Sequence, residues 1–177
     1  MTKSLLLAGF GGQGILFAGK QIAACGMIKG MNITWLPSYG PESRGGTCNC
    51  SVIISDEEIG SPIVNHPDYL VVFNVPSFIK FESTVKPYGT IFADSTLVNK
   101  ISDRDDISVY YVPASGIAVK NDLMGYANVV MLGKIVAVTK LFTYNDFLDH
   151  MLANIPASKS AMIDKNKRAF DLGFSFK

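Results

Sequence analysis

A glycine-rich segment, Gly9–Gly14, is the part of the sequence with the clearest potential for chemistry. It reads Gly-Phe-Gly-Gly-Gln-Gly, which is the spacing of a phosphate-binding G-x-G-x-x-G fingerprint. One apolar run, Leu5–Ala8, precedes it and another, Ile15–Ala18, follows it. This order predicts a strand, a tight turn and a helix whose free backbone N–H groups and positive dipole end can face an anion.

The spacing gives the glycines separate expected roles. Gly9 permits a sharp turn, Gly11 lets a ligand phosphate approach the backbone, and Gly14 lets the helix pack closely on the strand. We therefore expect the turn to hold the phosphates of a nucleotide-type ligand. The alternative that stays open is a plain tight turn between strand and helix, because this motif also occurs without a ligand.

A nicotinamide or flavin dinucleotide site would need a second element that the sequence lacks. Such a site places an acidic residue about twenty residues beyond the glycines, at the tip of the second strand. That tip is Trp35–Ser38, which contains neither an acid nor an arginine, and Glu42 comes only later in a Gly/Pro loop. The binding of another phosphate-bearing ligand stays open.

The segment Ser38–Gly46 carries the most informative charge of the chain. It is rich in glycine and other small residues, and it contains Arg44, one of only three arginines in the sequence. A flexible loop that presents one guanidinium group suits a phosphate, a carboxylate or an acidic group of a partner. The alternative is a solvated loop charge.

The chain lacks a metal-ligand set and a catalytic set of its own. Its three cysteines, Cys25, Cys48 and Cys50, include no C-x-x-C pair, and His66 and His150 lie in a predicted loop and a predicted amphipathic helix. Structural zinc and iron–sulfur sites need four well-spaced ligands. There is also no G-x-S-x-G nucleophile elbow. We therefore predict no catalytic residues and no metal ligands in this chain.

The composition is that of a chain with a large apolar fraction and little charge. Of its 177 residues, 48% are hydrophobic and 18% are charged, and the formal net charge is +1. This content predicts a single domain over residues 1–177. The low charged fraction suggests that partner subunits cover part of the surface. A net charge near zero gives no broad field that favours nucleic acid or a membrane.

No segment of the sequence predicts export or membrane insertion. The N-terminus leads into the glycine segment without a signal-peptide pattern. The longest apolar stretch, Val129–Phe142, is too short to span a bilayer and contains Lys134 and Lys140. An odd, sparse set of cysteines is typical of a reducing cytosol. We expect a cytoplasmic protein.

Apolar runs alternate with helical patterns along the first two thirds of the chain. The predicted strands cover 4–8, 32–36, 47–55, 69–73, 90–93 and 109–112. The predicted helices cover 12–28, a short stretch from 77, 126–142, 143–155 and 158–172. Alternation of this kind predicts an α/β fold, Rossmann-like, with a mostly parallel sheet flanked by helices and a helical C-terminal third.

Three segments together resemble the gamma subunit of 2-oxoacid:ferredoxin oxidoreductases. They are Gly9–Gly14, Ser38–Thr47 and Asn166–Gly173. The resemblance covers essentially the whole chain, and its middle segment is the longest and most specific. The sequence departs from the family pattern at Ser43, where methionine is more usual, and at Cys48, where a small residue such as alanine is more usual.

The resemblance implies a heteromeric complex of anaerobic metabolism. Such a complex converts a 2-oxoacid (pyruvate, 2-oxoglutarate or ketoisovalerate) and coenzyme A to acyl-CoA and carbon dioxide, with reduction of ferredoxin. The resemblance places thiamine diphosphate and the iron–sulfur clusters on other subunits. The implied partners are alpha and beta subunits and, where the complex has one, a ferredoxin-like delta subunit, with ferredoxin reached through the complex.

The resemblance also implies that this chain helps to hold coenzyme A, although it binds no cofactor alone. The expected contacts with the coenzyme A phosphates are Gly9, Gly11, Gly12, Gln13, Gly14 and Arg44. Two alternatives stay open. One is the equivalent subunit of indolepyruvate:ferredoxin oxidoreductase, and the other is a stand-alone nucleotide-binding or regulatory module.

Overall fold

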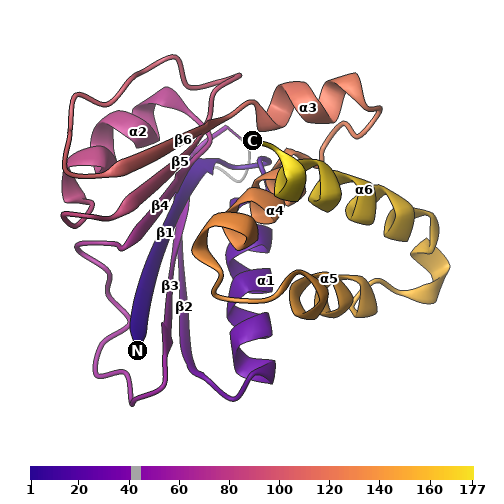
Figure 1. Cartoon of the computed structure of the whole chain (residues 1–177), viewed down its shortest axis with the longest axis horizontal. Coiled ribbons are helices and arrows are strands. Elements are labelled where there is room, and N and C mark those ends of the chain that lie inside the picture. Colours follow the sequence, from indigo (N-terminus) through magenta and orange to yellow (C-terminus); the bar gives the residue numbers. More distant parts are fainter. Residues whose placement is uncertain (41–44) are drawn as a thin grey trace.

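The computed structural model of the chain describes residues 1–40 and 45–177. Its centre is a six-stranded sheet flanked by helices (Figure 1). The strands are β1 (Thr2–Phe10), β2 (Asn32–Tyr39), β3 (Thr47–Ser55), β4 (Tyr69–Val72), β5 (Thr90–Asp94) and β6 (Ser108–Val112). The helices are α1 (Ile15–Ile28), α2 (Val75–Phe81), α3 (Ala114–Lys120), α4 (Ala127–Thr139), α5 (Tyr144–Ala153) and α6 (Ala161–Ser175). Short 3₁₀ turns cover Glu82–Thr84 and Ala157–Lys159.

The strand order across the sheet is β2-β3-β1-β4-β5-β6. Strands β1, β4, β5 and β6 are parallel, whereas β3 is antiparallel to both β1 and β2. The predicted Rossmann-like, mostly parallel sheet is therefore confirmed. The antiparallel β3 enters it because β2 and β3 form a hairpin that folds back beside β1.

The chain leaves β1 and β4 in opposite directions. After β1 it crosses through α1 to β2 on one side of the sheet, and after β4 it crosses through α2 to β5 on the other side. The carboxyl ends of β1 and β4 therefore flank a topological switch point. In open α/β sheets, ligands bind in the crevice at such a point.

Two apolar clusters lie on opposite faces of the sheet. Leu5 and Leu7 of β1 belong to the cluster shared with α1, α4, α5 and α6, whereas Leu6 and Ala8 belong to the cluster shared with α2. Figure 1 shows α2 on the other side of the sheet from α1, α4 and α6. Because successive side chains of a strand point to opposite faces, a central strand covered on both sides has to be apolar throughout.

Helix α1 packs closely on β2 and β3. A Cβ atom at Gly19 would lie 2.4 Å from the Cys50 Sγ atom, and one at Gly26 would lie 2.6 Å from the Ile33 Cδ1 atom. The predicted helix begins at residue 12, but α1 begins at Ile15. The reason for this difference is the backbone of the glycine segment before it, which cannot be helical where φ is positive.

Helices α4 and α6 cross with their backbones in direct contact. A Cβ atom at Gly173 of α6 would lie 1.7 Å from the Val130 carbonyl oxygen of α4. A Cβ atom at Gly133 of α4 would lie 2.2 Å from the Phe170 carbonyl oxygen of α6. The crossing therefore has no room for any side chain at these two glycines.

Three further details differ from the sequence-based expectation. Strand β2 continues through Pro37 to Tyr39, because an edge strand tolerates a residue without an N–H group. Helix α3 was not predicted, since it is short and follows Pro113 without a clear apolar period. The last helix begins at Ala161 and extends to Ser175. Across the described residues, no helix is long and apolar enough to cross a bilayer.

Candidate functional site

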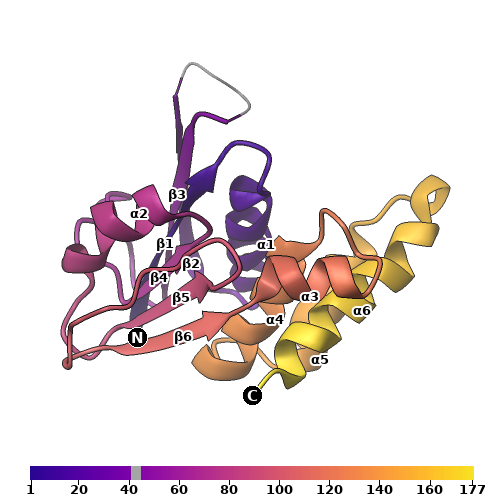
Figure 2. The ribbon, with the colours of Figure 1, turned by 90° about the horizontal axis from the view of Figure 1, so that it is seen from above.

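The glycine turn lies at the topological switch point, between the end of β1 and the start of α1. In Figure 2 the end of β2 and the start of β3 project beyond the other strands, close to this turn. The Gly11 amide donates a hydrogen bond of 2.9 Å to the Gly46 carbonyl oxygen, which ties the segment before β3 to the turn. The turn, the end of the hairpin and the start of α1 therefore meet at one edge of the sheet.

Glycine is required at two positions of the turn. Gly12 has a φ of 98° and Gly14 has a φ of 75°, a region that L side chains rarely adopt. Gly9 lies within β1, paired with Cys48, so the expectation that Gly9 makes the turn is wrong. A Cβ atom at Gly9 would lie 2.5 Å from the Gln13 Oε1 atom. The absence of a side chain at Gly9 makes room for Gln13.

The Gln13 side chain braces the turn against the next strand. Its Oε1 atom accepts a hydrogen bond of 2.7 Å from the Phe10 amide. Its Nε2 atom donates a hydrogen bond of 2.9 Å to the Phe73 carbonyl oxygen, just beyond β4. The Gln13 amide therefore uses one N–H group and its oxygen within the protein, which leaves only the second N–H group of Nε2 for the expected phosphate contact.

We expect Gln13→Met to lower the free energy of unfolding by about 2–3 kcal/mol, because it leaves one backbone donor and one backbone acceptor unpaired. The matched control is Gln21→Met in α1, since the Gln21 amide makes no hydrogen bond with a described residue. Gln21→Met removes a buried oxygen without a partner, so it should not lower the free energy of unfolding. Urea denaturation of both variants measures the difference, and equal losses would contradict the bracing role of Gln13.

The backbone N–H groups of the turn divide into paired and unpaired ones. Gly11 donates to Gly46 and Gln13 donates to the Phe10 carbonyl oxygen at 3.2 Å. Gly12, Gly14 and the first turn of α1, Ile15–Phe17, have no acceptor among the residues that the structure describes. These backbone N–H groups, within residues 12–17, are therefore the ones available to bind an anion. The expected approach of a phosphate to the N–H group of Gly11 is not supported, because that group is already bonded.

Gly14 has a packing role that differs from the expected one. A Cβ atom there would lie 2.2 Å from the Asn128 Nδ2 atom of α4, so Gly14 makes room for a neighbouring helix and not for the strand. The Asn128 Nδ2 atom donates to the Gly14 carbonyl oxygen at 3.4 Å. Asn128 was not identified from the sequence. The feature that could have indicated its role is a single amide side chain at the start of a buried apolar helix.

An open pocket of about 420 Å³ adjoins the unpaired N–H groups. It is lined by Phe10, Gly11, Gly12, Gly14, Ile15, Leu16, Phe17, Tyr39, Thr47 and Cys48. These residues include no charged side chain, so the polar character of the pocket comes mainly from backbone groups. Burial raises the pKa of the Cys48 thiol, which therefore stays protonated and poorly nucleophilic at neutral pH.

Arg44, the remaining expected contact, lies outside the described residues. The two residues that follow it, Gly45 and Gly46, are hydrogen-bonded to Gly11 through their backbones. The chain is therefore joined to the glycine turn at the two residues directly after Arg44.

The described part of the chain contains no group of three or more His, Cys, Asp or Glu side chains that could hold a metal ion. Cys25, Cys48 and Cys50 are buried free thiols. Burial raises the pKa of Cys25 to about 11 and that of Cys50 to about 12. Cys50 donates a weak hydrogen bond to the Ile15 carbonyl oxygen. The cysteines therefore act as core residues.

Comparison with known sequences gives consistent matches. The family model described as pyruvate ferredoxin/flavodoxin oxidoreductase matches residues 4–176. The chain is 38% identical over 167 residues to the ketoisovalerate oxidoreductase subunit VorA of Methanothermobacter thermautotrophicus, which covers 94% of this chain but only 35% of VorA. It is 33% identical over 177 residues to the 2-oxoglutarate synthase subunit KorC of Methanocaldococcus jannaschii, covering 98% of this chain and 93% of KorC.

Comparison with solved structures supports the fold. The gamma subunit of a keto/oxoacid ferredoxin oxidoreductase from Geobacter sulfurreducens matches with a TM-score of 0.85 and 28% identity, over 98% of this chain and 95% of that one. A 2-oxoglutarate:ferredoxin oxidoreductase from Magnetococcus marinus, solved with 2-oxoglutarate, coenzyme A and succinyl-CoA bound, matches with a TM-score of 0.85 and 23% identity. That match covers 97% of this chain and 30% of the solved one, and it concerns the fold alone.

Proposed function

Since this chain belongs to the pyruvate ferredoxin/flavodoxin oxidoreductase family, we propose that it serves as the gamma-type subunit of a 2-oxoacid:ferredoxin oxidoreductase. The complex would convert a 2-oxoacid and coenzyme A to acyl-CoA and carbon dioxide with reduction of ferredoxin. The relatives that support this proposal are named for ketoisovalerate, 2-oxoglutarate and pyruvate. The proposed location is the cytoplasm, in keeping with the buried free thiols.

In this proposal the glycine turn holds the pyrophosphate of coenzyme A. The observation that carries it is the row of N–H groups at Gly12, Gly14 and the first turn of α1 that have no acceptor among the described residues and border a pocket at the switch point of the sheet. Backbone N–H groups and the positive end of a helix dipole stabilise phosphate oxygens. A Cβ atom at Gly12 would meet nothing within 4 Å, so a ligand can come close to the backbone there.

Fewer residues are proposed to contact the coenzyme A phosphates than the sequence alone predicts. Gly12 and Gly14 offer N–H groups without an acceptor in the described part of the chain, whereas Gly9, Gly11 and Gln13 shape and brace the turn. Arg44 is proposed to add a guanidinium contact to the phosphates or to a neighbouring subunit, since it directly precedes in sequence Gly45 and Gly46, whose backbones bond to Gly11.

The redox chemistry is proposed to belong to the partner subunits. A cluster or a thiamine diphosphate–metal site needs several converging ligands, and the cysteines of this chain lie in the core between α1 and the sheet. Alpha and beta subunits, and a ferredoxin-like delta subunit where one is present, would supply those groups. This chain would then contribute to coenzyme A holding and to assembly.

The test is isolation of the affinity-tagged chain, without oxygen, from the cells that produce it. The expected result is a complex that carries thiamine diphosphate and iron–sulfur absorbance. It should reduce ferredoxin with pyruvate, ketoisovalerate or 2-oxoglutarate only when coenzyme A is present. Activity with indolepyruvate alone would instead support the indolepyruvate enzyme. A chain that is isolated without partners or activity would contradict the proposal and favour a stand-alone module.

A further inference from the structure

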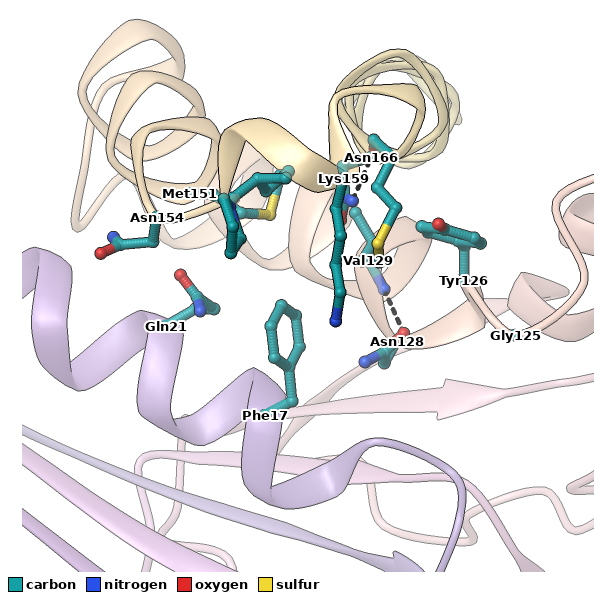
Figure 3. Close-up of a pocket in the computed structure, with 13 residues that line it drawn as sticks. Phe17, Gln21, Gly125, Tyr126, Asn128, Val129, Met151, Asn154, Lys159 and Asn166 are labelled. Atoms are coloured by element: carbon teal, nitrogen blue, oxygen red, sulfur yellow. Dashed lines mark hydrogen bonds between the residues drawn. The ribbon is translucent and has the colours of Figure 1, made fainter.

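A second pocket of about 420 Å³ lies on the other side of the first turns of α1. It is enclosed by α1, the start of α4, the end of α5 and the segment that leads into α6 (Figure 3). Phe17 is the one residue that lines both this pocket and the pocket at the glycine turn. The two pockets are therefore neighbours that share an aromatic wall.

One polar side chain of this second pocket has an atom without a hydrogen-bond partner. Gln21 of α1 is only 9% exposed, and its Oε1 atom is buried without a hydrogen-bond partner. Figure 3 shows its amide directed from α1 toward the space beside Asn154 and Met151. A buried amide without a partner is costly, about 1–3 kcal/mol, which a ligand with a complementary polar edge would offset.

One cation points into the same space. Lys159 is the only charged residue among those that line the pocket. Its backbone N–H group donates to the Pro156 carbonyl oxygen, whereas its side-chain amine has no ion pair or hydrogen bond with a residue that the structure describes. In Figure 3 its amine reaches between Phe17 and Asn128. A lone ammonium group without a facing carboxylate favours an anionic ligand, and Lys is a common phosphate binder.

The apolar walls suit a flat ring. Phe17 is 41% exposed, and Figure 3 shows its ring directed from α1 into the pocket, whose other walls include Met151 and Tyr126. Aromatic and methionine side chains make favourable contacts with aromatic rings. A glutamine amide pairs in a bidentate way with the edge of adenine, which offers one donor and one acceptor.

From these three features we propose that the second pocket binds an adenine nucleotide, with the base beside Phe17 and Gln21 and a phosphate at Lys159. The volume is in the range of small-molecule sites. The same chemistry is present in a free nucleotide and in the nucleotide end of coenzyme A. The inference rests on the pocket itself and stands whether or not the glycine turn holds a pyrophosphate.

The experiment is isothermal titration of the purified full-length chain with AMP. The expected result is saturable binding that weakens about tenfold or more in Lys159→Met and in Gln21→Met. Lys167→Met is the matched control, because Lys167 is exposed on α6 and does not line the pocket. Its AMP affinity should equal that of the unmodified chain. Adenosine and ribose 5-phosphate should each bind at least about tenfold more weakly than AMP.

Two further measurements distinguish a free nucleotide from coenzyme A, and the AMP site from the proposed glycine-turn site. If coenzyme A displaces AMP and is weakened by Lys159→Met, the pocket takes the nucleotide end of coenzyme A. If coenzyme A and AMP bind together, the pocket takes a free nucleotide. Gly12→Val should leave AMP binding unchanged. If this variant also binds coenzyme A as tightly as the unmodified chain, that result contradicts the proposed role of the glycine turn and leaves the AMP site intact. Absence of AMP binding at several millimolar, or equal binding by Lys159→Met, would overturn the inference.

Discussion

Gly173→Ala is expected to lower the free energy of unfolding by about 3 kcal/mol or more, because a methyl group at this position overlaps backbone atoms of α4. Its Cβ atom would lie 1.7 Å from the Val130 carbonyl oxygen and 2.6 Å from the Val130 carbonyl carbon. Backbone atoms cannot rotate away, so α4 and α6 would have to move apart. The melting temperature should fall by roughly 6–12 °C for a chain of this length.

Gly26→Ala is the matched control for this effect. Gly26 is also a buried helical glycine, but a Cβ atom there would meet the end of the Ile33 side chain at 2.6 Å, which can turn aside. Alanine also improves helix propensity by about 1 kcal/mol. Calorimetry should therefore find a change within about 1 kcal/mol. Equal melting temperatures for the two variants would contradict the close crossing of α4 and α6.

Gly12→Val is expected to raise the KM for coenzyme A at least about tenfold in the assembled complex, with a much smaller effect on the KM for the 2-oxoacid. Gly12 has a φ of 98°, and its N–H group has no acceptor within residues 1–40 and 45–177. A branched side chain would disturb this backbone and occupy space next to the pocket. The chain should still assemble, because nothing lies within 4 Å of the new Cβ atom.

Gly30→Val separates the site from simple backbone strain. Gly30 has a φ of 76° and also has nothing within 4 Å of an added Cβ atom, but it lies beyond the far end of α1. Both substitutions should therefore cost similar stability. Steady-state kinetics of the two complexes should show a raised KM for coenzyme A only with Gly12→Val. A raised KM in both, or in neither, would contradict the role of the glycine turn.

The sequence pattern was sufficient to predict the strands and helices that are buried uniformly along one face or on both faces. Strand β3 has the bounds that the sequence predicts, 47–55. Its residues Cys48, Cys50, Val52 and Ile54 share one buried face. Strand alternation and continuous apolar runs depend on which faces are covered, and this information is local in the sequence. The start of α5 is also set locally, because the Thr143 side chain accepts a hydrogen bond of 3.2 Å from the Asp146 amide three residues later.

The parts that were not predictable depend on contacts between distant segments. The glycine motif located the turn, but the roles of its members were set by Gln13 reaching Phe73 and by Asn128 reaching Gly14. Neither partner is marked by spacing near the motif. The second pocket is of the same kind, because it joins Gln21 to Lys159 across more than a hundred residues of sequence. Such sites arise only when α1, α4, α5 and α6 are packed together.

The structure of the assembled complex with coenzyme A bound tests the central claim most directly. The account predicts phosphate oxygens within about 2.7–3.2 Å of backbone nitrogens along residues 12–17. It further predicts that the Gln13 side chain keeps its hydrogen bonds to Phe10 and Phe73. A pyrophosphate held entirely by another subunit, with the N–H groups of Gly12 and Gly14 facing only solvent, would contradict it.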